Sequence, residues 1–197
     1  MIKKLTVVLC KLSDTKAEEN AFGRYINNPK VTPSGIVSHY HTIERHDFTD
    51  KHVLIVQDTS TNSFGLHSER KGLGYVGEKT PKTGFAMHPA IYMDAVDGAC
   101  YGLGGVSFWN TPLPQDEASE KEKLERRKVV SKLALEEKES YKWYSTVNQA
   151  IENNNSAAQY TIVGDREADI YELYSRYEQQ GWGWLIRCST NRKLLDE

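Results

Sequence analysis

Two aspartates each follow directly on a short apolar run of strand-forming residues. Asp58 comes after His52–Gln57, and Asp165 comes after Thr161–Gly164. Sheets of α/β proteins present acids to ligands in this way, because the ligand crevice lies beyond the carboxyl ends of the strands. Carboxylate oxygens are the ligands that Mg²⁺ prefers, and Mn²⁺ accepts the same donors. The sequence therefore predicts a site for Mg²⁺ or Mn²⁺ built by Asp58 and Asp165.

The composition of the chain argues against several classes of protein. Its 197 residues suit one domain with a short appendage, and their composition is that of an ordinary globular protein. The net charge is −2, and the sequence contains no strongly basic stripe. Both observations count against a protein that binds DNA through overall charge alone. The three cysteines are far apart and fit neither a disulfide framework nor a zinc site. No apolar run is long enough to span a membrane, so no membrane partner is expected.

Residues 1–45 are predicted to be helical. Apolar residues recur at helical spacing at the start of the chain; they are Ile2, Leu5, Val8, Leu9 and Leu12. A second helix is predicted over Thr15–Ile26, because an Asn-Asn-Pro break follows it. Thr32 and Pro33 have the residue types of a helix cap and a first helical position, which predicts a third helix from there.

The next part of the chain is predicted to form strands. The run His52–Gln57 is apolar without alternation, which is typical of a central strand covered on both faces. Residues 59–83 are polar and rich in glycine, and a loop is predicted there. Phe85–Ala95 and Ala99–Trp109 are predicted to pair as a hairpin, because Val96-Asp97-Gly98 between them contains an Asp-Gly turn.

Helices and strands alternate in the last part of the chain. The densely charged segment Gln115–Lys142 is predicted to enter one long helix, whose apolar stripe is Trp143, Val147, Ala150 and Ile151. A strand over Tyr160–Val163, a helix from Ile170 and a strand over Trp182–Cys188 follow.

This order of elements predicts the fold class. Three early strands in a meander, followed by alternating helix and strand, describe a ribonuclease H-like α/β fold, a mixed sheet flanked by helices. The fold would occupy residues 46–197 and be preceded by the short helical segment 1–45. In that topology the first and fourth strands lie side by side and parallel, so Asp58 and Asp165 would be neighbours.

Several segments spread along the chain share their residues with one known family. They are Glu19–Tyr25 with Val31-Thr32, Gln57–Ser60, Gly84-Phe85 with His88, Glu137–Trp143, Asp165–Ile170, and Trp184–Arg187 with Arg192-Lys193. In this order they resemble the DDE transposases of the IS4 class, and the Tn5 transposase group most closely. The Asp-Arg-Glu-Ala-Asp block after an apolar strand is the most specific of them. The resemblance covers residues 15–195.

The resemblance implies DNA cleavage and strand transfer at transposon ends by two-metal phosphoryl transfer. In the family scheme Asp58 bridges both metal ions and Asp165 binds one of them. The DNA contacts that the resemblance implies are Thr59, Arg187 and Lys193. Residues 1–45 resemble the end of the family's N-terminal DNA-binding domain. Family members bind transposon ends and target DNA as homodimers, and the expected location is the nucleoid in a bacterial cytoplasm.

One feature of the family is missing from the sequence. The third acid of the family is a glutamate on a later helix, within a Tyr-x-x-Arg-x-x-x-Glu-x-x-x-x-x-x-Lys signature that these 197 residues do not contain. We therefore expect a fragment or a shortened product, with weak metal binding and little catalysis of its own. The alternative function is a non-catalytic product that binds DNA or inhibits assembly. A different nuclease of the same fold is a further alternative.

Residues close to the two aspartates have simpler explanations as well. Asp58-Thr59-Ser60 is also a turn-forming cluster, because such side chains hydrogen-bond to nearby backbone. Asp169 has capping-box spacing to Glu172, so it is predicted to cap a helix. Glu167 lies too close in sequence to Asp165 to replace an acid from another helix. We expect Glu167 and Asp169 to support the metal ligands and not to bind metal themselves.

Two further residues and one motif are assigned structural roles. His88 is predicted to be a hydrogen-bonded structural histidine, and Arg192 part of a solvated basic edge. The segment Gly72–Gly77 matches the dinucleotide fingerprint G-x-G-x-x-G, which has meaning only between a strand and a helix. Ser68–Lys71 before it and Lys79–Pro81 after it fit neither requirement. A flexible loop near the active-site side is therefore predicted.

Overall fold

The computed structural model separates into two units, Met1–Glu44 and Arg45–Glu197. The residues that it describes are 6, 8–65, 72–76, 82–110, 125, 128–130 and 132–191. No helix among them is long and apolar enough to cross a membrane.

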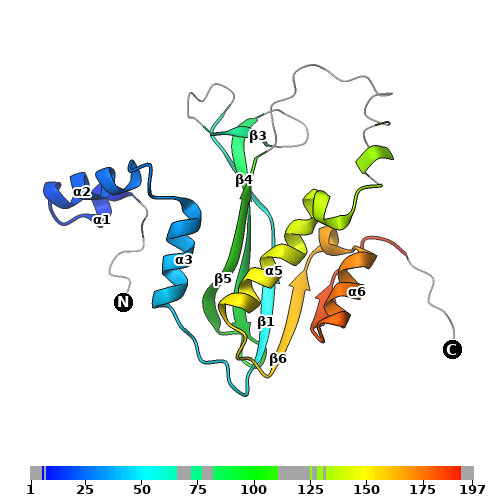
Figure 1. The fold of residues 1–197 in the computed structure, drawn as a ribbon. Coiled ribbons are helices and arrows are strands. Elements are labelled where there is room, and N and C mark those ends of the chain that lie inside the picture. The colour runs from blue at the N-terminus through cyan, green and yellow to red at the C-terminus, as the bar shows by residue number, and fades with distance from the viewer. Residues whose placement is uncertain are drawn as a thin grey trace, which may run out of the picture. The chain divides into compact units, whose positions relative to one another are not determined.

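The first unit contains the helices α1 (Leu9–Leu12), α2 (Lys16–Ile26) and α3 (Pro33–Ile43) (Figure 1). The hydroxyl of Thr15 accepts a hydrogen bond from the backbone of α2, and that of Thr32 accepts one from the backbone of α3. Pro33 stands in the first turn of α3. The predictions for α2 and α3 are therefore confirmed, because local capping signals set where they begin.

The first predicted helix is shorter than expected within the described residues. α1 begins at Leu9, while Ile2 and Leu5 of the predicted apolar stripe lie outside the described part of the chain. None of the three helices contains a buried residue. For α2 and α3, the structure shows local side-chain caps rather than burial in a core.

The second unit is built on a seven-stranded mixed sheet. Its strands are β1 (His52–Gln57), β2 (Ser60–Ser63), β3 (Gly74–Val76), β4 (Lys82–Asp94), β5 (Cys100–Trp109), β6 (Gln159–Gly164) and β7 (Gly183–Ile186). β4 is antiparallel to both β5 and β1, whereas β1, β6 and β7 are parallel neighbours. An antiparallel meander that continues into parallel strands is the ribonuclease H-like order, so the predicted fold class is confirmed (Figure 1).

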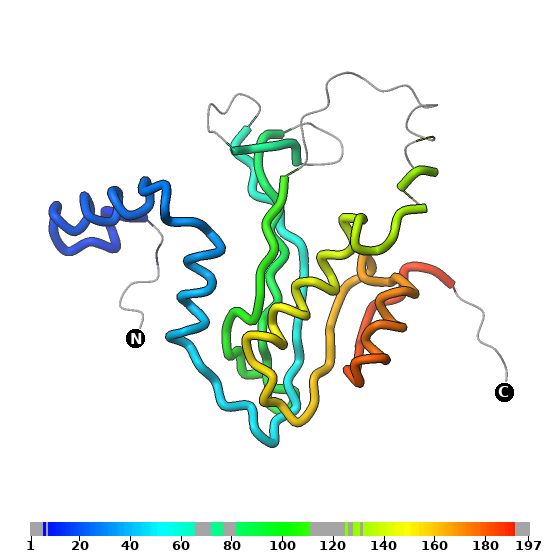
Figure 2. The backbone as a smooth tube through the Cα atoms, viewed as in Figure 1, coloured from blue at the N-terminus to red at the C-terminus, as the bar shows by residue number. Residues whose placement is uncertain are grey.

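The β4–β5 hairpin has the turn that the sequence predicted. Figure 2 shows it as the long pair of green strands. Gly98 adopts a positive φ of 73°, which glycine tolerates without strain. The Asp97 carboxylate accepts a hydrogen bond from the Ala99 backbone N–H at 2.8 Å. The Asp-Gly pair therefore closes the hairpin through local interactions.

Helices α5 (Lys142–Asn153) and α6 (Tyr171–Gln179) contribute to one core with the sheet. Short 3-10 helices lie before α5, η1 (Leu135–Glu137) and η2 (Glu139–Tyr141), and before α6, η3 (Arg166–Ala168). The largest fully buried side chains include Trp143 of α5 and Tyr177 of α6. They pack with Val53, Ile55 and Ile162 of the two central strands. Burial of these large apolar side chains holds the central strands in place.

Burial along β1 corrects the prediction of a strand covered on both faces. Val53 and Ile55 are fully buried, but Leu54 and Val56 between them are only partly buried. Side chains alternate between the two faces of a strand, and α5 and α6 pack on only one of those faces. The opposite face of β1 is incompletely covered by the described residues.

Two other predictions were wrong in detail. The predicted loop over residues 59–83 contains β2 and β3, which pair with the long strand β4 despite their polar or glycine-rich sequences. The predicted long helix from Gln115 is not continuous: residues 128–130 are helical, but residues 132–134, η1 and η2 separate them from α5, which begins at Lys142. Residues 115–124, 126, 127 and 131 of that prediction lie outside the described part of the chain. For β2 and β3, pairing with the distant strand β4, rather than local pattern, decides the structure.

Candidate active site

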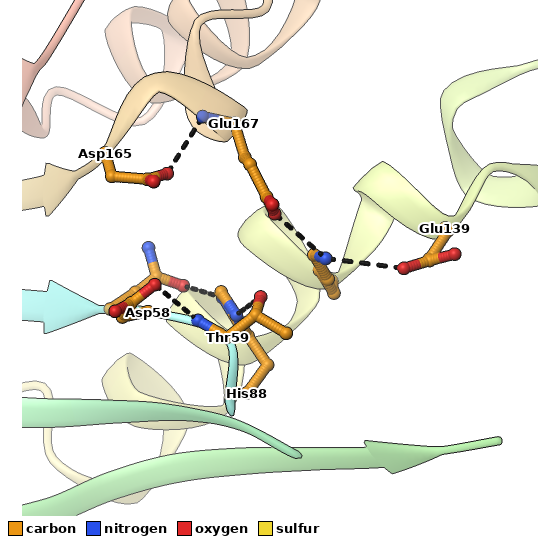
Figure 3. A network of polar contacts seen from close by, with 8 residues as sticks. Asp58, Thr59, His88, Glu139, Asp165 and Glu167 are labelled. Carbon is orange, nitrogen blue, oxygen red and sulfur yellow. Dashed lines mark hydrogen bonds and ion pairs between the residues drawn. The ribbon is translucent and has the colours of Figure 1, made fainter. Parts of the chain in front are cut away.

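The pairing of β1 with β6 sets the two predicted acids side by side. Val56 pairs with Val163 in the parallel ladder, and each aspartate lies two residues further along its own strand. Neighbouring strands lie about 4.8 Å apart. Figure 3 shows Asp58 and Asp165 at the ends of their strands, facing the same space. The structure therefore brings Asp58 and Asp165 together.

Each aspartate is fixed by one backbone hydrogen bond. Oδ1 of Asp58 accepts the N–H of Thr59 at 2.7 Å, and Oδ1 of Asp165 accepts the N–H of Glu167 at 2.8 Å. Both aspartates are exposed to solvent. Within the described part of the chain, no ion pair involves either carboxylate. Two exposed carboxylates without a cationic partner are therefore available to a positively charged ligand.

The donor set fits a hard divalent cation. Mg²⁺ and Mn²⁺ take carboxylate oxygens and keep several waters, so two carboxylates are enough to hold an ion. Among the described residues, no group of three or more His, Cys, Asp or Glu side chains has the arrangement of a metal site. Asp58 and Asp165 are thus the residues that could hold a metal ion here, and the described residues supply no third acid.

The backbone next to Asp165 depends on the glycine before it. A Cβ atom on Gly164 would lie 2.9 Å from the Ala168 side chain and 3.1 Å from the ring of Trp143. Only glycine leaves room there for the turn of η3 and for Trp143 together. Gly164 therefore allows the chain to turn sharply immediately after β6 and to present Asp165 at the strand end.

Glu167 is held by a lysine that sequence reasoning did not single out. Lys142 Nζ lies 3.4 Å from Glu167 Oε2 and 3.5 Å from Glu139 Oε1. The same ammonium group lies 4.8 Å from the centre of the Trp109 ring, and the Lys142 side chain is only 10% exposed. Figure 3 shows the Glu167 side chain extending toward this ammonium group. Lys142 is the first residue of α5 and follows a charged segment, so the sequence alone did not show which residues it contacts.

Asp169 has a different role from the predicted helix cap. α6 begins at Tyr171 without a side-chain cap, and the Asp169 carboxylate accepts a hydrogen bond from the Tyr174 hydroxyl at 2.5 Å. Its other oxygen accepts the backbone N–H groups of Ser189 and Thr190 at 2.6 and 3.2 Å, and their hydroxyls at 2.9 and 3.3 Å. The capping prediction is wrong because these long-range donors engage the carboxylate. Asp169 ties the segment after β7 to the turn after Asp165.

The structure describes two of the three predicted DNA contacts. The backbone N–H of Arg187 donates to the carbonyl of Gly164 at 3.2 Å, so exposed Arg187 lies at the same end of the sheet as Asp165. Thr59 is half-buried directly after Asp58. Lys193, together with Arg192, lies outside the described residues.

His88 is a fully buried histidine beside the two acids. Its Nδ1 lies 2.9 Å from Thr59 Oγ1, and its Nε2 lies 3.2 Å from Gln57 Oε1. Its ring meets the Trp143 ring edge-on at 4.5 Å between centroids. The pKa of His88 is lowered to about 4, mainly by burial and also by the charge of Lys142, against the opposing effect of Asp165. His88 is therefore neutral near pH 7, and the prediction of a hydrogen-bonded structural histidine is confirmed.

The glycine motif does not form a dinucleotide site in the described residues. Gly74–Val76 form β3, which pairs antiparallel with β4, and Gly72 has a positive φ of 79°. The Asn110 side chain donates a hydrogen bond to the Gly72 carbonyl at 2.6 Å. Gly77, the last glycine of the motif, lies outside the described part of the chain. β3 corrects the prediction that the segment is only a loop.

Among known proteins, similarity to this chain is found only at the level of distant structure. No family model and no curated protein matches the chain. Among solved structures, the Mos1 mariner paired end complex with Mn is similar, with a TM-score of 0.31 and 10% identity over 85% of this chain. The chain spans 50% of the length of that protein. The assignment of the fold rests on the strand order and register described above, and not on this likeness.

Proposed function

We propose that this chain is the catalytic core of a DNA transposase that acts on phosphodiester bonds with Mg²⁺ or Mn²⁺ held by Asp58 and Asp165. The observation that carries the proposal is the parallel pairing of β1 with β6, which sets two exposed carboxylates side by side. The resemblance of the sequence segments to IS4-class transposases, and to the Tn5 group within them, supports the finer assignment. The proposal includes a location at the bacterial nucleoid.

The residues of the site have distinct parts in this chemistry. Bound divalent ions would stabilise the attacking and leaving oxygens of an in-line displacement at phosphorus. Asp58 and Asp165 would hold these ions through oxygens that the described residues leave without a cationic partner. Exposed Arg187, whose backbone lies beside Gly164, would add positive charge at this end of the sheet, while Lys142 would hold Glu167 beside it. Their contribution would be positioning and charge stabilisation of the substrate.

DNA is the partner that this site requires. Arginine binds backbone phosphates without reading sequence, so Arg187 would help to place the duplex but would not select it. Transposon ends and target DNA are the substrates that the resemblance supports. Residues 1–45 would belong to the end of a DNA-binding domain, and the assembly on DNA would be a homodimer.

A second candidate function is a non-catalytic protein that binds DNA or inhibits transposase assembly. The observation that favours it is the number of acids, because only two carboxylates converge within the described residues. Glu167, the nearest further acid, is paired with Lys142 at 3.4 Å. A site with an incomplete ligand set would bind metal weakly and react slowly.

Calorimetric titration of Mn²⁺ into the whole chain tests the proposed site. We expect weak binding that disappears in Asp58→Ala and in Asp165→Asn. The matched control is Asp97→Asn, because Asp97 is an exposed turn aspartate and asparagine keeps its acceptor for Ala99. Equal binding in all four proteins would show that these two aspartates are not the site.

Nicking of supercoiled DNA separates the two candidate functions. Mn²⁺-dependent nicking that disappears in Asp58→Ala would exclude the non-catalytic alternative. Retention of DNA in a gel-shift assay without any nicking would favour it. Charge reversal in Arg187→Glu is expected to weaken that retention and to reduce its salt dependence.

A further inference from the structure

The backbone register links His88 to the residue that follows Asp58. The ladder of β1 with β4 and the ladder of β2 with β4 follow one register. Continued between the two ladders, this register sets Thr59 opposite His88 and Asp58 opposite Pro89. Side chains of directly opposed residues lie on the same face of a sheet. Thr59 and His88 therefore meet on the face that α5 covers.

Hydrogen bonds and one ring contact connect the core to the residues beside Asp58. The Tyr177 hydroxyl, on α6, donates a hydrogen bond to the backbone carbonyl of Trp143 at 3.1 Å. The Trp143 ring packs edge-on against the His88 ring. The ring nitrogens of His88 contact Gln57 Oε1 at 3.2 Å and Thr59 Oγ1 at 2.9 Å. Figure 3 shows these contacts beneath the Asp58 carboxylate. Each end of the histidine is thus held by a residue adjacent to Asp58.

The protons of this network can be assigned from its acceptors. A neutral imidazole has one donor nitrogen and one acceptor nitrogen. With the Gln57 amide oriented so that its carbonyl oxygen faces Nε2, Nε2 donates and Nδ1 accepts the hydroxyl hydrogen of Thr59. Thr59 then has its hydroxyl turned inward to His88 and its backbone N–H turned toward Asp58 Oδ1. Rotation of the Thr59 side chain would break its hydrogen bond to His88, and rotation of its backbone would break its hydrogen bond to Asp58.

The chemical type of the buried residues also points to a role beyond packing. Gln57 is 3% exposed and His88 is 0% exposed, and both lie next to an apolar core. Burying an amide and an imidazole costs free energy that an apolar side chain of similar volume would not. The hydrogen bond of His88 to Thr59 lies on the side of the network that faces the exposed aspartates. Its position connects the rigid core to the orientation of one candidate metal ligand.

We propose that His88 and Thr59 are positioning residues that hold the Asp58 carboxylate in the orientation that binds a divalent cation. The inference rests on the proposed function, since it assumes that Asp58 is a metal ligand. It adds that the affinity for the cation depends on a hydrogen bond that the cation does not touch. Partners of metal ligands typically change metal affinity by roughly 10- to 100-fold when removed.

The test is the affinity for Mn²⁺, followed by loss of the free-ion electron paramagnetic resonance signal. Thr59→Val removes the hydroxyl at nearly constant shape, and we expect it to weaken Mn²⁺ binding by roughly tenfold. Thr59→Ser keeps the hydroxyl and should bind within about twofold of the unmodified chain. The matched control is Thr161→Val, which breaks another threonine–histidine bond of the sheet, to His52 at 2.8 Å, away from the acids.

Two substitutions of His88 supply the rescue experiment. Asparagine places its amide where Nδ1 lies and can still accept the Thr59 hydroxyl, whereas glutamine places its amide where Nε2 lies. We expect His88→Asn to retain most of the Mn²⁺ affinity and His88→Gln to lose it. Thermal unfolding of each variant shows which of them are folded. In nitrogen-15 NMR, the Nδ1 resonance of His88 should move in Thr59→Val because it loses its donor.

The outcomes separate this inference from the proposed function. Binding of Mn²⁺ by folded Thr59→Val at the affinity of the unmodified chain would overturn the role of Thr59 and His88 alone. An Nδ1 resonance unchanged in Thr59→Val would do the same. No binding by the unmodified chain would overturn the proposed metal site and this inference together.

Discussion

Two threonine–histidine pairs join neighbouring strands of the same sheet, and they stand in opposite environments. At the carboxyl end of β1, Thr59 meets His88, which is completely buried. At the beginning of β1, His52 meets Thr161, and both of these side chains are partly accessible to water. The chemical groups are the same, but water can replace the partner in only one pair. Burying the His88 imidazole costs free energy that the water-accessible pair avoids, and this cost falls directly beside the candidate metal ligands.

The largest expected loss of stability comes from removing the ring of Trp143, which packs against His88 of the buried pair. Trp143 is 1% exposed and packs against His88 and the core. We expect Trp143→Ala to lower the free energy of unfolding by ~3–5 kcal/mol, because it opens a large cavity. Urea unfolding measures this. The control is Trp184→Ala, whose ring is 47% exposed and stacks on Tyr174, and a smaller loss is expected there. Equal losses would show that Trp143 does not support the core in this way.

The pH dependence of stability distinguishes the buried pair from the accessible one. The pKa of His88 is lowered by burial to about 4 in the folded chain, below the ordinary histidine value of 6.5. Between these two values the unfolded chain binds more protons, so stability falls as the pH falls from about 6.5 toward 4. At pH 5 the loss attributable to His88 should be about 2 kcal/mol.

Comparison with His88→Asn isolates this contribution. The variant lacks the titrating ring, so its stability should fall less between pH 7 and pH 5 than that of the unmodified chain. His52→Asn should leave the steep dependence in place. Parallel curves for the unmodified chain and His88→Asn, in urea unfolding at several pH values, would contradict the depressed pKa.

Removing the two threonine hydroxyls compares the pairs directly. Thr59→Val leaves a buried ring nitrogen without its partner, and we expect a loss of ~1–2 kcal/mol in the free energy of unfolding. Thr161→Val leaves His52 accessible to water, so the loss should be under ~1 kcal/mol. Thermal and urea unfolding of both variants measure the difference. A larger loss in Thr161→Val would reverse the proposed contrast between the two pairs.

The smallest effect on stability is expected at the candidate metal ligands themselves. Asp58 and Asp165 are exposed, and asparagine keeps the acceptor for the backbone N–H in each place. Asp58→Asn and Asp165→Asn should change the free energy of unfolding by less than ~0.5 kcal/mol while abolishing the binding of Mn²⁺. A large destabilisation in either variant would assign that aspartate a structural role.

Some of the fold and part of the site could be predicted because the signals are local. Thr15 and Thr32 cap helices within three residues of themselves, and the Asp97-Gly98 turn closes a hairpin between its own neighbours. The two aspartates at strand ends were recognisable for the same reason. Their adjacency followed from the order of elements, since a right-handed parallel connection leaves few alternatives.

The rest of the site could not be predicted because its partners are distant in sequence. Asp169 matched a helix cap by spacing, but donors at Ser189 and Thr190 engage its carboxylate instead. Lys142 looked like one charge among many until the fold set it between Glu139 and Glu167. Spacing along the chain carries no information about such contacts.

Short-range signals in the sequence specify where α2 and α3 begin, which residues turn the β4–β5 hairpin, and that two strands end on carboxylates. These properties depend on interactions over a few residues. Only the tertiary structure decided which face of β1 is covered, that polar β2 and β3 pair with β4, and that His88 lies behind Asp58. Such features depend on register between strands and on packing against α5, where a shift of one residue would move every side chain to the other face.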